Sequence, residues 1–261
     1  MITSTSNPQV KSLIQLMQKA RARRERGLYV VEGVRMFREA PADRIEGIYV
    51  SESFERQSEN RELLDGKRYE VLSDKVYHFV SDTKTPQGIL CLVRMREYSE
   101  EEVLADENGM WLVLESMQDP GNLGTAFRSG EGAGIAGIIL DATTADPYNP
   151  KTIRSTMGSI YRVPFLVSKD LLDTLKTMHL RGIRILAAHA EGSACYSEED
   201  YTGATAFLIG NEGNGLSEAA LAAADERICI PMRGQLESLN ASTAAAILLY
   251  EADRQRRQGE V

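Results

Sequence analysis

The sequence predicts an α/β protein in which a parallel-sheet domain follows a smaller α/β unit. Two observations predict this fold. Apolar, strand-like runs alternate with helix-like stretches from residue 111 to residue 254. The first 95 residues also mix helices and strands, but without this regular alternation. Alternating strands and helices are typical of a parallel sheet that helices cover on both faces. Ligands of such sheets bind beyond the carboxyl ends of the strands.

The elements of the second half follow from short apolar runs and amphipathic stretches. Strands are predicted at Trp111–Leu114, Gly137–Leu140, Pro164–Val167, Ile183–Ala188, Ala206–Ile209 and Ile228–Ile230. Helices are predicted at Leu123–Ala133, Leu171–Leu180, Ser217–Ala224 and Leu239–Arg254.

The first half contains fewer strong signals. Apolar residues at helical spacing predict a helix over Val10–Arg23 and another over Val34–Ala40. Strands are predicted at Leu28–Val31, Ile45–Val50 and Gly88–Val93. The acidic stretch of residues 96–110 is interpreted as a partly helical linker, which gives domains at residues 1–95 and 111–261.

Composition bounds the function classes. The 261 residues carry a net charge of −8, which argues against a protein that coats nucleic acid nonspecifically. Three scattered cysteines favour neither a disulfide framework nor a zinc site. No apolar run reaches the roughly 20 residues of a membrane span, and the polar N-terminus does not resemble a secretory signal. We therefore expect a cytoplasmic protein with no metal and no membrane partner.

One basic group stands out from the acidic background. Six cations fall within sixteen residues, namely Lys11, Lys19, Arg21, Arg23, Arg24 and Arg26, with Glu25 as the one opposing charge. A solvated helix face and a stripe that contacts phosphates are both open interpretations.

Residues Gly132, Gly134 and Gly137 fit a G-x-G-x-x-G pattern. A dinucleotide site requires a strand before this pattern and a helix after it, and here the predicted order is reversed. These glycines are predicted to end a helix and to turn into a strand.

Three clusters carry the chemistry. In the first, Pro120 and Gly121 suit a turn after a strand, Asn122 is expected to cap a helix, and Arg128 lies two turns into that helix. The second, residues 210–216, has three glycines and Glu212 directly after a buried strand, which favours a ligand loop over a hairpin. The third, residues 230–240, places Ser238 and Asn240 before an Ala-rich helix. Helix capping explains one of these two side chains but not the long loop.

Together these clusters resemble the three signature motifs of the SpoU/TrmH branch of the SPOUT RNA methyltransferases. The similar residues are Asn122 to Arg128, Gly210-Asn-Glu-Gly, and Ile230-Pro-Met with Ser238-Leu-Asn240. Residues 149–159 also resemble the family, and the similarity covers about residues 111–256. The part around Tyr29–Gly33 resembles a small substrate-binding domain with a ribosomal-protein-like fold.

The resemblance implies a C-terminal trefoil knot, a homodimer and S-adenosylmethionine as cofactor. It implies that Gly210, Ile230 and Leu239, with Met232 nearby, hold the cofactor largely through backbone groups. Arg128 would face the ribose 2′-hydroxyl of an RNA, as base or as electrostatic stabiliser. The other side chains of the site would support it: Asn122, Ser238 and Asn240 would hold the ribose, a phosphate and Arg128, and Glu212 would pair with Arg128 or with an Asn.

RNA binding would then extend to the N-terminal unit. We expect Lys19, Arg21, Arg23, Arg24 and Arg154 to contact the RNA backbone. Ribosomal RNA is the favoured substrate because of the preceding small domain. The alternatives are a transfer RNA substrate, a non-catalytic RNA-binding protein with the same fold, and a nicotinamide-linked enzyme.

Overall fold

The computed structural model describes residues 1–259, and its contacts group them into two compact units. The first unit contains Met1–Arg96 together with Asp146–Tyr161. The second contains Glu97–Ala145 and the described chain from Arg162 onward. Segment 146–161, which the sequence analysis placed inside the C-terminal domain, thus contacts the N-terminal unit.

The second unit is built on a seven-stranded sheet with the order β7-β6-β5-β10-β8-β11-β9. Every pairing in it is parallel. The strands are β5 Met110–Leu114, β6 Gly137–Leu140, β7 Phe165–Val167, β8 Arg184–Ala188, β9 Ala194–Cys195, β10 Thr205–Ile209 and β11 Glu226–Cys229. Both faces of β5 and β10 are buried, as expected for a sheet between helical layers.

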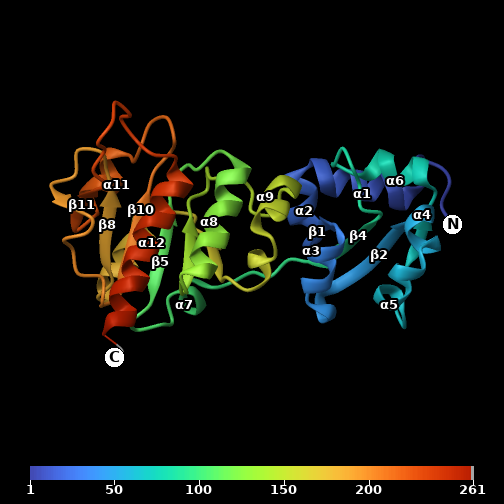
Figure 1. Ribbon diagram of the computed structural model, residues 1–261, viewed down its shortest axis with the longest axis horizontal. Coiled ribbons are helices and arrows are strands. Elements are labelled where there is room, and N and C mark those ends of the chain that lie inside the picture. The colour runs from blue at the N-terminus through green and yellow to red at the C-terminus, as the bar shows by residue number, and fades with distance from the viewer. Residues whose placement is uncertain (260–261) are drawn as a thin grey trace. The chain divides into compact units, whose positions relative to one another are not determined.

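Helices cover this sheet on both sides. They are α7 Glu100–Val103, α8 Pro120–Gly132, α10 Leu171–Leu180, α11 Glu218–Ala222 and α12 Ala241–Gln258. Residues of α7, α10 and α11 share one apolar cluster with alternate strand residues such as Trp111 and Val113. The helices α8 and α12 contact each other and lie in front of the sheet in Figure 1. The predicted parallel α/β fold is confirmed.

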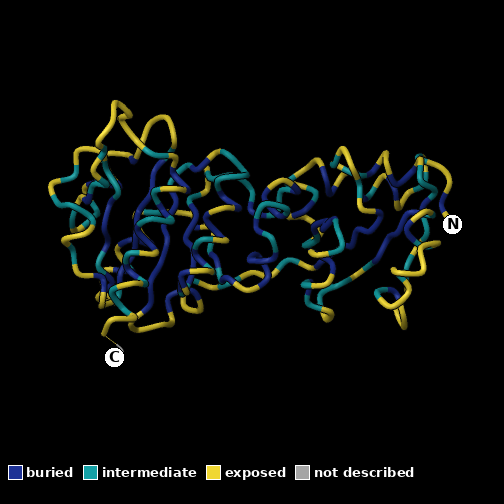
Figure 2. Tube along the Cα trace, viewed as in Figure 1, coloured by how far each residue is buried: buried dark blue, intermediate teal, exposed yellow. Residues whose placement is uncertain are grey.

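The first unit is a smaller mixed sheet with the order β1-β4-β2-β3. Its strands are β1 Leu28–Glu32, β2 Ile45–Ser51, β3 Glu70–Leu72 and β4 Ile89–Arg94. Its helices are α1 Pro8–Gln18, α2 Ala20–Arg26, α3 Val34–Glu39, α4 Glu52–Arg56, α5 Arg61–Leu64, α6 Asp74–Val80 and α9 Pro150–Thr156. One apolar cluster joins α1 and α6 to this sheet. Figure 2 shows that burial is deepest along strands such as β1 and β4 of this unit and β5 and β10 of the second.

The predicted helix over Val10–Arg23 is divided, because the chain is extended at Lys19 (φ −121°, ψ 111°). The Arg23 guanidinium stabilises this break. It donates to the carbonyls of Leu16 at 2.7 Å and Met17 at 3.1 Å, which are among the unpaired carbonyls of the last turn of α1. Its other edge forms an ion pair with Asp146 at 2.5 Å. Arg23 therefore ties α1 and α2 to segment 146–161.

Residues 1–259 contain no disulfide, no helix that could span a membrane and no cluster of metal ligands. Cys91, Cys195 and Cys229 are all free. No helix in that range is both long and apolar enough to cross a membrane. No group of three or more His, Cys, Asp or Glu side chains there is arranged to hold a metal ion. The glycine pattern runs from Gly132, the last residue of α8, to Gly137, the first residue of β6, so it turns from a helix into a strand as predicted and lacks the context of a dinucleotide site.

Candidate active site

The three sequence clusters lie at the carboxyl ends of strands in the second unit. The first runs from the end of β5 into α8, and the second directly follows β10, the neighbour of β5 in the sheet. The third follows β11 and leads into α12. This is the edge at which ligands of parallel sheets bind.

One amide side chain connects all three clusters. Asn122 Nδ2 donates to Glu212 Oε1 at 2.8 Å, and Asn122 Oδ1 accepts from Asn240 Nδ2 at 3.1 Å. These partners are 90 and 118 residues away along the chain. Because an amide has both a donor and an acceptor end, Asn122 can satisfy the carboxylate and the second amide together. The predicted residues Asn122, Glu212 and Asn240 therefore form one network.

A fourth member of the network, Ser242, was not predicted from the sequence. Its side chain is buried, and its hydroxyl donates to Asn240 Oδ1 at 2.7 Å while lying 3.4 Å from Asn122 Oδ1. It thereby fixes the orientation of both amides. Its position two residues after the Asn240 cap was the available signal in the sequence, but the Ala-rich composition of this helix is typical of packing positions.

Two helix N-termini meet at this network. Asn240 caps α12 by accepting from the N–H groups of Ser242 at 3.0 Å and Thr243 at 3.2 Å. The expectation that Asn122 caps α8 is wrong. Asp119 is the cap and accepts from the Asn122 N–H at 2.9 Å, because Pro120 occupies the first helical position. The positive ends of two helices thus favour negative charge here.

The glycine-rich loop closes on itself after β10. A Cβ atom on Gly210 would lie 2.3 Å from the carbonyl carbon of Gly215, so any other residue there would displace backbone. Asn211 Nδ2 donates to the Ser116 carbonyl at 2.7 Å, and its Oδ1 accepts from the Gly213 N–H at 2.8 Å. These bonds fix the loop that carries Glu212 against the end of β5.

Two further carboxylates brace the same edge. Glu115 accepts from the backbone N–H and the hydroxyl of Ser217, at 2.8 Å and 2.7 Å. Asp141, after β6, accepts from the N–H of Ser116, a residue held at φ +56°. Burial acts to raise the pKa of Asp141, but hydrogen bonds from Thr143, Thr144 and the Ser116 N–H hold that pKa below its ordinary value. Asp141 is therefore ionised at neutral pH and fixes the turn after β5.

The structure does not bond the other two predicted catalytic residues to this network. Arg128 is exposed on α8, six residues after Asn122, and within residues 1–259 its guanidinium has no hydrogen-bond or ion-pair partner. Ser238 is exposed in the loop before α12 and likewise bonds to no other side chain of the described chain. Glu212 pairs with Asn122, the second of the two predicted options.

The four predicted cofactor residues lie in two loops, one after β10 and one after β11. Gly210 is buried, and Ile230, Met232 and Leu239 are each half-buried at the ends of their loops. In the described chain, the backbone N–H and C=O groups of residues 231–239 make no hydrogen bonds to other protein groups. Free main-chain donors and acceptors beside apolar side chains fit an adenine ring, which needs both edge hydrogen bonds and flat apolar contact.

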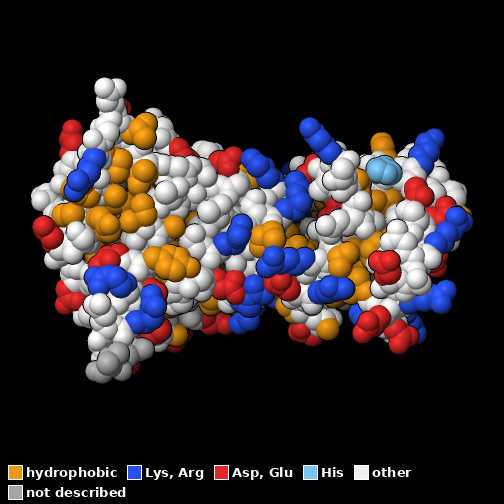
Figure 3. Space-filling view, in the orientation of Figure 1, with side chains coloured by type: hydrophobic (Ala, Val, Ile, Leu, Met, Phe, Trp, Pro, Cys, Tyr) orange, Lys and Arg blue, Asp and Glu red, His pale blue; other side chains and the backbone are white. Residues whose placement is uncertain are grey.

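The predicted RNA-contact residues lie in the first unit and differ in their availability. Lys19 and Arg24 are exposed, and Figure 3 shows Lys and Arg side chains over α2. Arg21 pairs with Glu25, and Arg154 pairs with Asp82 at 3.0 Å. The prediction for Arg23 is wrong, because this side chain is 2% exposed and fully engaged by Asp146 and two carbonyls.

Two known protein families match this chain. The SpoU rRNA methylase family matches residues 109–250, more than half of the chain. This chain belongs to that family. A second match, to the MRM3-like substrate-binding domain, covers residues 7–91. The family predicted from the three clusters is confirmed.

Individual members of the SpoU family are similar along nearly the whole chain. The 23S rRNA (guanosine(2553)-2′-O)-methyltransferase RlmP of Bacillus subtilis is 33% identical over 251 residues, which span 95% of this chain and 97% of that protein. A Synechocystis protein named an uncharacterized tRNA/rRNA methyltransferase is 33% identical over 260 residues, 98% of this chain and 94% of the other.

A solved structure extends the likeness to three dimensions. The SpoU methyltransferase AviRb from Streptomyces viridochromogenes, in complex with AdoMet (S-adenosylmethionine), superposes with a TM-score of 0.87 at 28% identity. The match covers 96% of this chain and 98% of that chain. The α/β fold predicted from sequence, with its N-terminal substrate-binding unit, is the fold of this family.

Proposed function

We propose that this protein transfers a methyl group from S-adenosylmethionine to a ribose 2′-hydroxyl of ribosomal RNA. The observation that carries the proposal is the bonded network of Asn122, Glu212 and Asn240, which unites three distant clusters at one sheet edge. Membership of the SpoU family and the activity named for RlmP support it. Residues 111–261 would be catalytic, and residues 1–95 would bind RNA.

Gly210, Ile230, Met232 and Leu239 would hold the cofactor, with the free backbone groups of residues 231–239 as its hydrogen-bond partners. When bound, S-adenosylmethionine supplies an activated methyl group on a sulfonium, so the protein needs no metal. At Gly210 the backbone lies so close to that of Gly215 that no side chain fits there, so this part of the cofactor site would be main chain alone. Positioning of the acceptor oxygen is then the main task of the chain.

Arg128 would stabilise the negative charge that develops on the ribose oxygen as its proton leaves. A guanidinium has a pKa above about 12, so electrostatic stabilisation is its physically easier role, and action as a base would require a strongly perturbed site. The N-termini of α8 and α12 add positive potential at the same edge. Asn122 and Asn240, fixed by Glu212 and Ser242, would orient the ribose, and Ser238 would reach an adjacent phosphate.

The RNA-binding surface of the first unit would contain Lys19, Arg21, Arg24 and Arg154. Lys19 and Arg24 are the stronger candidates because neither has a partner among residues 1–259, whereas Arg21 and Arg154 already form ion pairs. A homodimer, a trefoil knot in the second unit and a cytoplasmic location complete the proposal, and they rest on the resemblance and on the sequence.

Tritiated methyl transfer to total RNA tests this function. Arg128→Ala should lose nearly all transfer while cofactor binding stays measurable by calorimetry, and Arg257→Ala, which changes an exposed guanidinium on α12, is the matched control. Near-normal turnover of Arg128→Ala rejects the role of that residue. Wild-type protein that binds S-adenosylmethionine but methylates no RNA indicates a non-catalytic RNA-binding protein. If the label appears in transfer RNA rather than in ribosomal RNA, the substrate is a transfer RNA.

A further inference from the structure

Two of the three cysteines lie opposite each other at the edge of the seven-stranded sheet. Cys195 ends β9, Cys229 ends β11, and the two residues are direct partners in the parallel pairing of these strands. The Tyr196 N–H donates to the Cys229 carbonyl at 3.0 Å, as this pairing requires. Because side chains alternate between the faces along each strand, paired residues share a face. The sheet therefore brings together two thiols that are far apart in the sequence.

The spacing of this pair suits a disulfide under strain. Neighbouring strands lie about 4.8 Å apart, which is within the range of about 4.4–6.8 Å for the Cα atoms of a disulfide. The Cβ atoms of a disulfide lie about 3.8 Å apart, so the bond requires the two strands to approach by about 1 Å. Strand β9 has two residues, is the last strand of the sheet and pairs with β11 alone in the described chain, so it can supply this movement. Strained disulfides are easily reduced and are typical of reversible bonds.

Both thiols are free and half-buried, so a small oxidant can reach them. The Ser197 hydroxyl lies 3.2 Å from Cys195 Sγ. A hydroxyl in that position can donate to a thiolate, which is the nucleophilic form of cysteine. Cys195 is therefore the expected attacking sulfur, and Cys229 is the sulfur that completes the bond.

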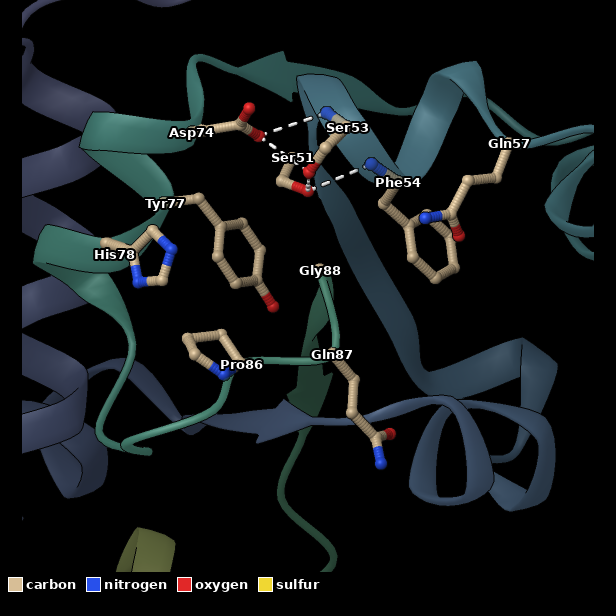
Figure 4. Close-up of a pocket in the computed structure, with 10 residues that line it drawn as sticks. All are labelled: Ser51, Ser53, Phe54, Gln57, Asp74, Tyr77, His78, Pro86, Gln87 and Gly88. Carbon is tan, nitrogen blue, oxygen red and sulfur yellow. Dashed lines mark hydrogen bonds between the residues drawn. The ribbon is translucent and has the colours of Figure 1, made fainter.

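The third cysteine provides an internal comparison. Cys91 lies on β4 in the first unit and is completely buried, and burial raises the pKa of its thiol to about 12. The cavity of about 120 Å³ in that unit does not expose it, because the lining on this side is the chain that ends at Gly88, before β4 begins (Figure 4). A thiol that stays protonated and shielded from solvent is inert to oxidants.

The cysteine pair adjoins the candidate cofactor loop. Cys229 is the last residue of β11, and Ile230, one of the four candidate cofactor residues, follows it directly. Residues 231–239 then present the backbone groups that lack protein partners within the described chain. Movement of Cys229 toward β9 would carry Ile230 with it, since one peptide bond joins them. A bond between the two thiols would thus displace one wall of the cofactor site.

We propose that Cys195 and Cys229 form a reversible disulfide in response to hydrogen peroxide, and that this bond lowers the affinity for S-adenosylmethionine. The Cys195 thiolate attacks one peroxide oxygen, the O–O bond breaks, and the leaving hydroxide takes the thiol proton to form water. The sulfur of Cys229 then attacks the resulting sulfenic sulfur, and the S–O bond breaks. The hydroxide released leaves with the Cys229 proton as a second water. One peroxide thus accepts two electrons, one from each thiol sulfur.

The formation of the bond does not depend on the proposed function, but its effect does, because Ile230 and Met232 are cofactor residues only under that proposal. In a reducing compartment such a bond would be transient, as expected of a redox-sensing pair rather than of a structural disulfide.

Peptide mapping of the full chain tests the bond. The reduced protein is treated with hydrogen peroxide, alkylated and digested, and mass spectrometry should find one peptide pair joined through Cys195 and Cys229. Cys91 should remain a thiol, which the reagent modifies only after unfolding. A non-reducing gel should show the joined protein as a single chain, and a dithiol should reverse the change. Sulfinic acid without a joined pair, or a bond between two chains, overturns the proposal.

The order of attack has a test of its own. Ser197→Ala should slow formation of the bond, because it removes the donor beside Cys195. Ser193→Ala is the matched control, since this exposed serine near β9 donates to Glu226 instead, and it should react as wild type does. An equal rate for wild type and Ser197→Ala would overturn the assignment of Cys195 as the attacking sulfur.

Calorimetry with S-adenosylmethionine tests the effect on the cofactor loop. Oxidised wild type should bind roughly three- to ten-fold more weakly than reduced wild type, the value of about one hydrogen bond, and a dithiol should restore the affinity. In a glutathione redox buffer, saturating S-adenosylmethionine should lower the equilibrium constant of the disulfide by the same factor. A disulfide that forms without any change in affinity overturns the coupling.

Cys195→Ser, which cannot form the bond, should bind as reduced wild type does after the same peroxide treatment. An equal loss of affinity in this variant would assign the effect to another oxidised side chain, such as Met232, and would overturn the proposal. The proposed function fails separately, because it is rejected by absence of methyl transfer from the reduced protein, while the peptide map remains readable.

Discussion

Replacing Asn122 by Asp is the sharpest test of the three-cluster network. The substitution keeps size and shape but removes the Nδ2 donor and places a second carboxylate beside Glu212, 2.8 Å from its Oε1. Loss of a hydrogen bond to a charged acceptor costs about 1.5–3 kcal/mol. Because each carboxylate shares its charge between two oxygens, the charge centres lie about 4 Å apart, a separation at which two unit charges repel by about 1 kcal/mol in bulk water and about 4 kcal/mol near a protein surface. The exposure of Glu212 favours the low end.

We therefore expect Asn122→Asp to lower the free energy of unfolding by about 2.5–4 kcal/mol at neutral pH, measured by urea unfolding. The loss should shrink as the pH falls, because two adjacent carboxyl groups raise the pKa of one of them and its protonation removes the repulsion. Methyl transfer should fall together with stability at neutral pH, since the ribose-orienting amide has lost its fixed position.

The control for added charge is Asn214→Asp. Asn214 lies in the loop that carries Glu212, and its side chain is exposed and outside the network. It should unfold within about 0.5 kcal/mol of wild type, as most surface changes do. The double change of Asn122→Asp with Glu212→Gln restores one donor and one acceptor and should recover most of the stability. A single Asn122→Asp variant as stable as the Asn214→Asp control would refute the view that this amide joins the clusters.

Three further predictions concern other parts of the chain. Gly210→Ala should destabilise the protein by about 1–3 kcal/mol and reduce cofactor affinity, because its Cβ would displace Gly215 backbone, whereas Gly213→Ala, with its nearest contact at 3.4 Å, should be tolerated in the same calorimetric assay. Because the pKa of Asp141 is lower in the folded than in the unfolded protein, its carboxylate contributes stability at a pH above the unfolded pKa of about 3.9, and this contribution is lost as the pH falls through the folded pKa. Asp141→Asn should therefore make the free energy of unfolding less dependent on pH in the acid range. An unchanged pH dependence would contradict this. Replacing Lys19 and Arg24 together by Ala should reduce the slope of log affinity for RNA against log salt by about 1.4–1.8, and an unchanged slope would remove them from the RNA surface.

Periodicity in the sequence located most elements of the second unit, because its strands are short continuous apolar runs and its helices have one apolar face. The predicted runs at Gly137–Leu140 and Leu171–Leu180 coincide with β6 and α10. Helices α4 and α5, with five and four residues, are too short to show a period and were missed in the first unit. Strand β3, with three residues, was missed for the same reason.

Side-chain roles were harder to predict wherever the partner lies far away in the sequence. Arg23 belongs by composition to a basic stripe, yet Asp146, 123 residues later, withdraws it from solvent. The sequence singles out Asn122 as a helix cap and a candidate catalytic residue. Its bridge to Glu212 and Asn240, which lie 90 and 118 residues away, depends on the order of the strands in the sheet. Ser242 and Glu115 look like ordinary helix and strand-end residues, because their partners Asn122 and Ser217 lie 120 and 102 residues away.

Segment 146–161 leaves the second unit between β6 and β7 and completes the first. It supplies Asp146 to Arg23, helix α9 beside β1, the Tyr148 ring whose centroid lies 4.6 Å from that of Tyr29 at a tilt of 41°, and the Tyr161 hydroxyl that donates to the Met36 carbonyl. A gene fragment cut after residue 96 would therefore express a unit that lacks one of its own walls and carries an uncompensated guanidinium. Dissection of this enzyme into separately folding halves needs a transplanted helix, not a single cut.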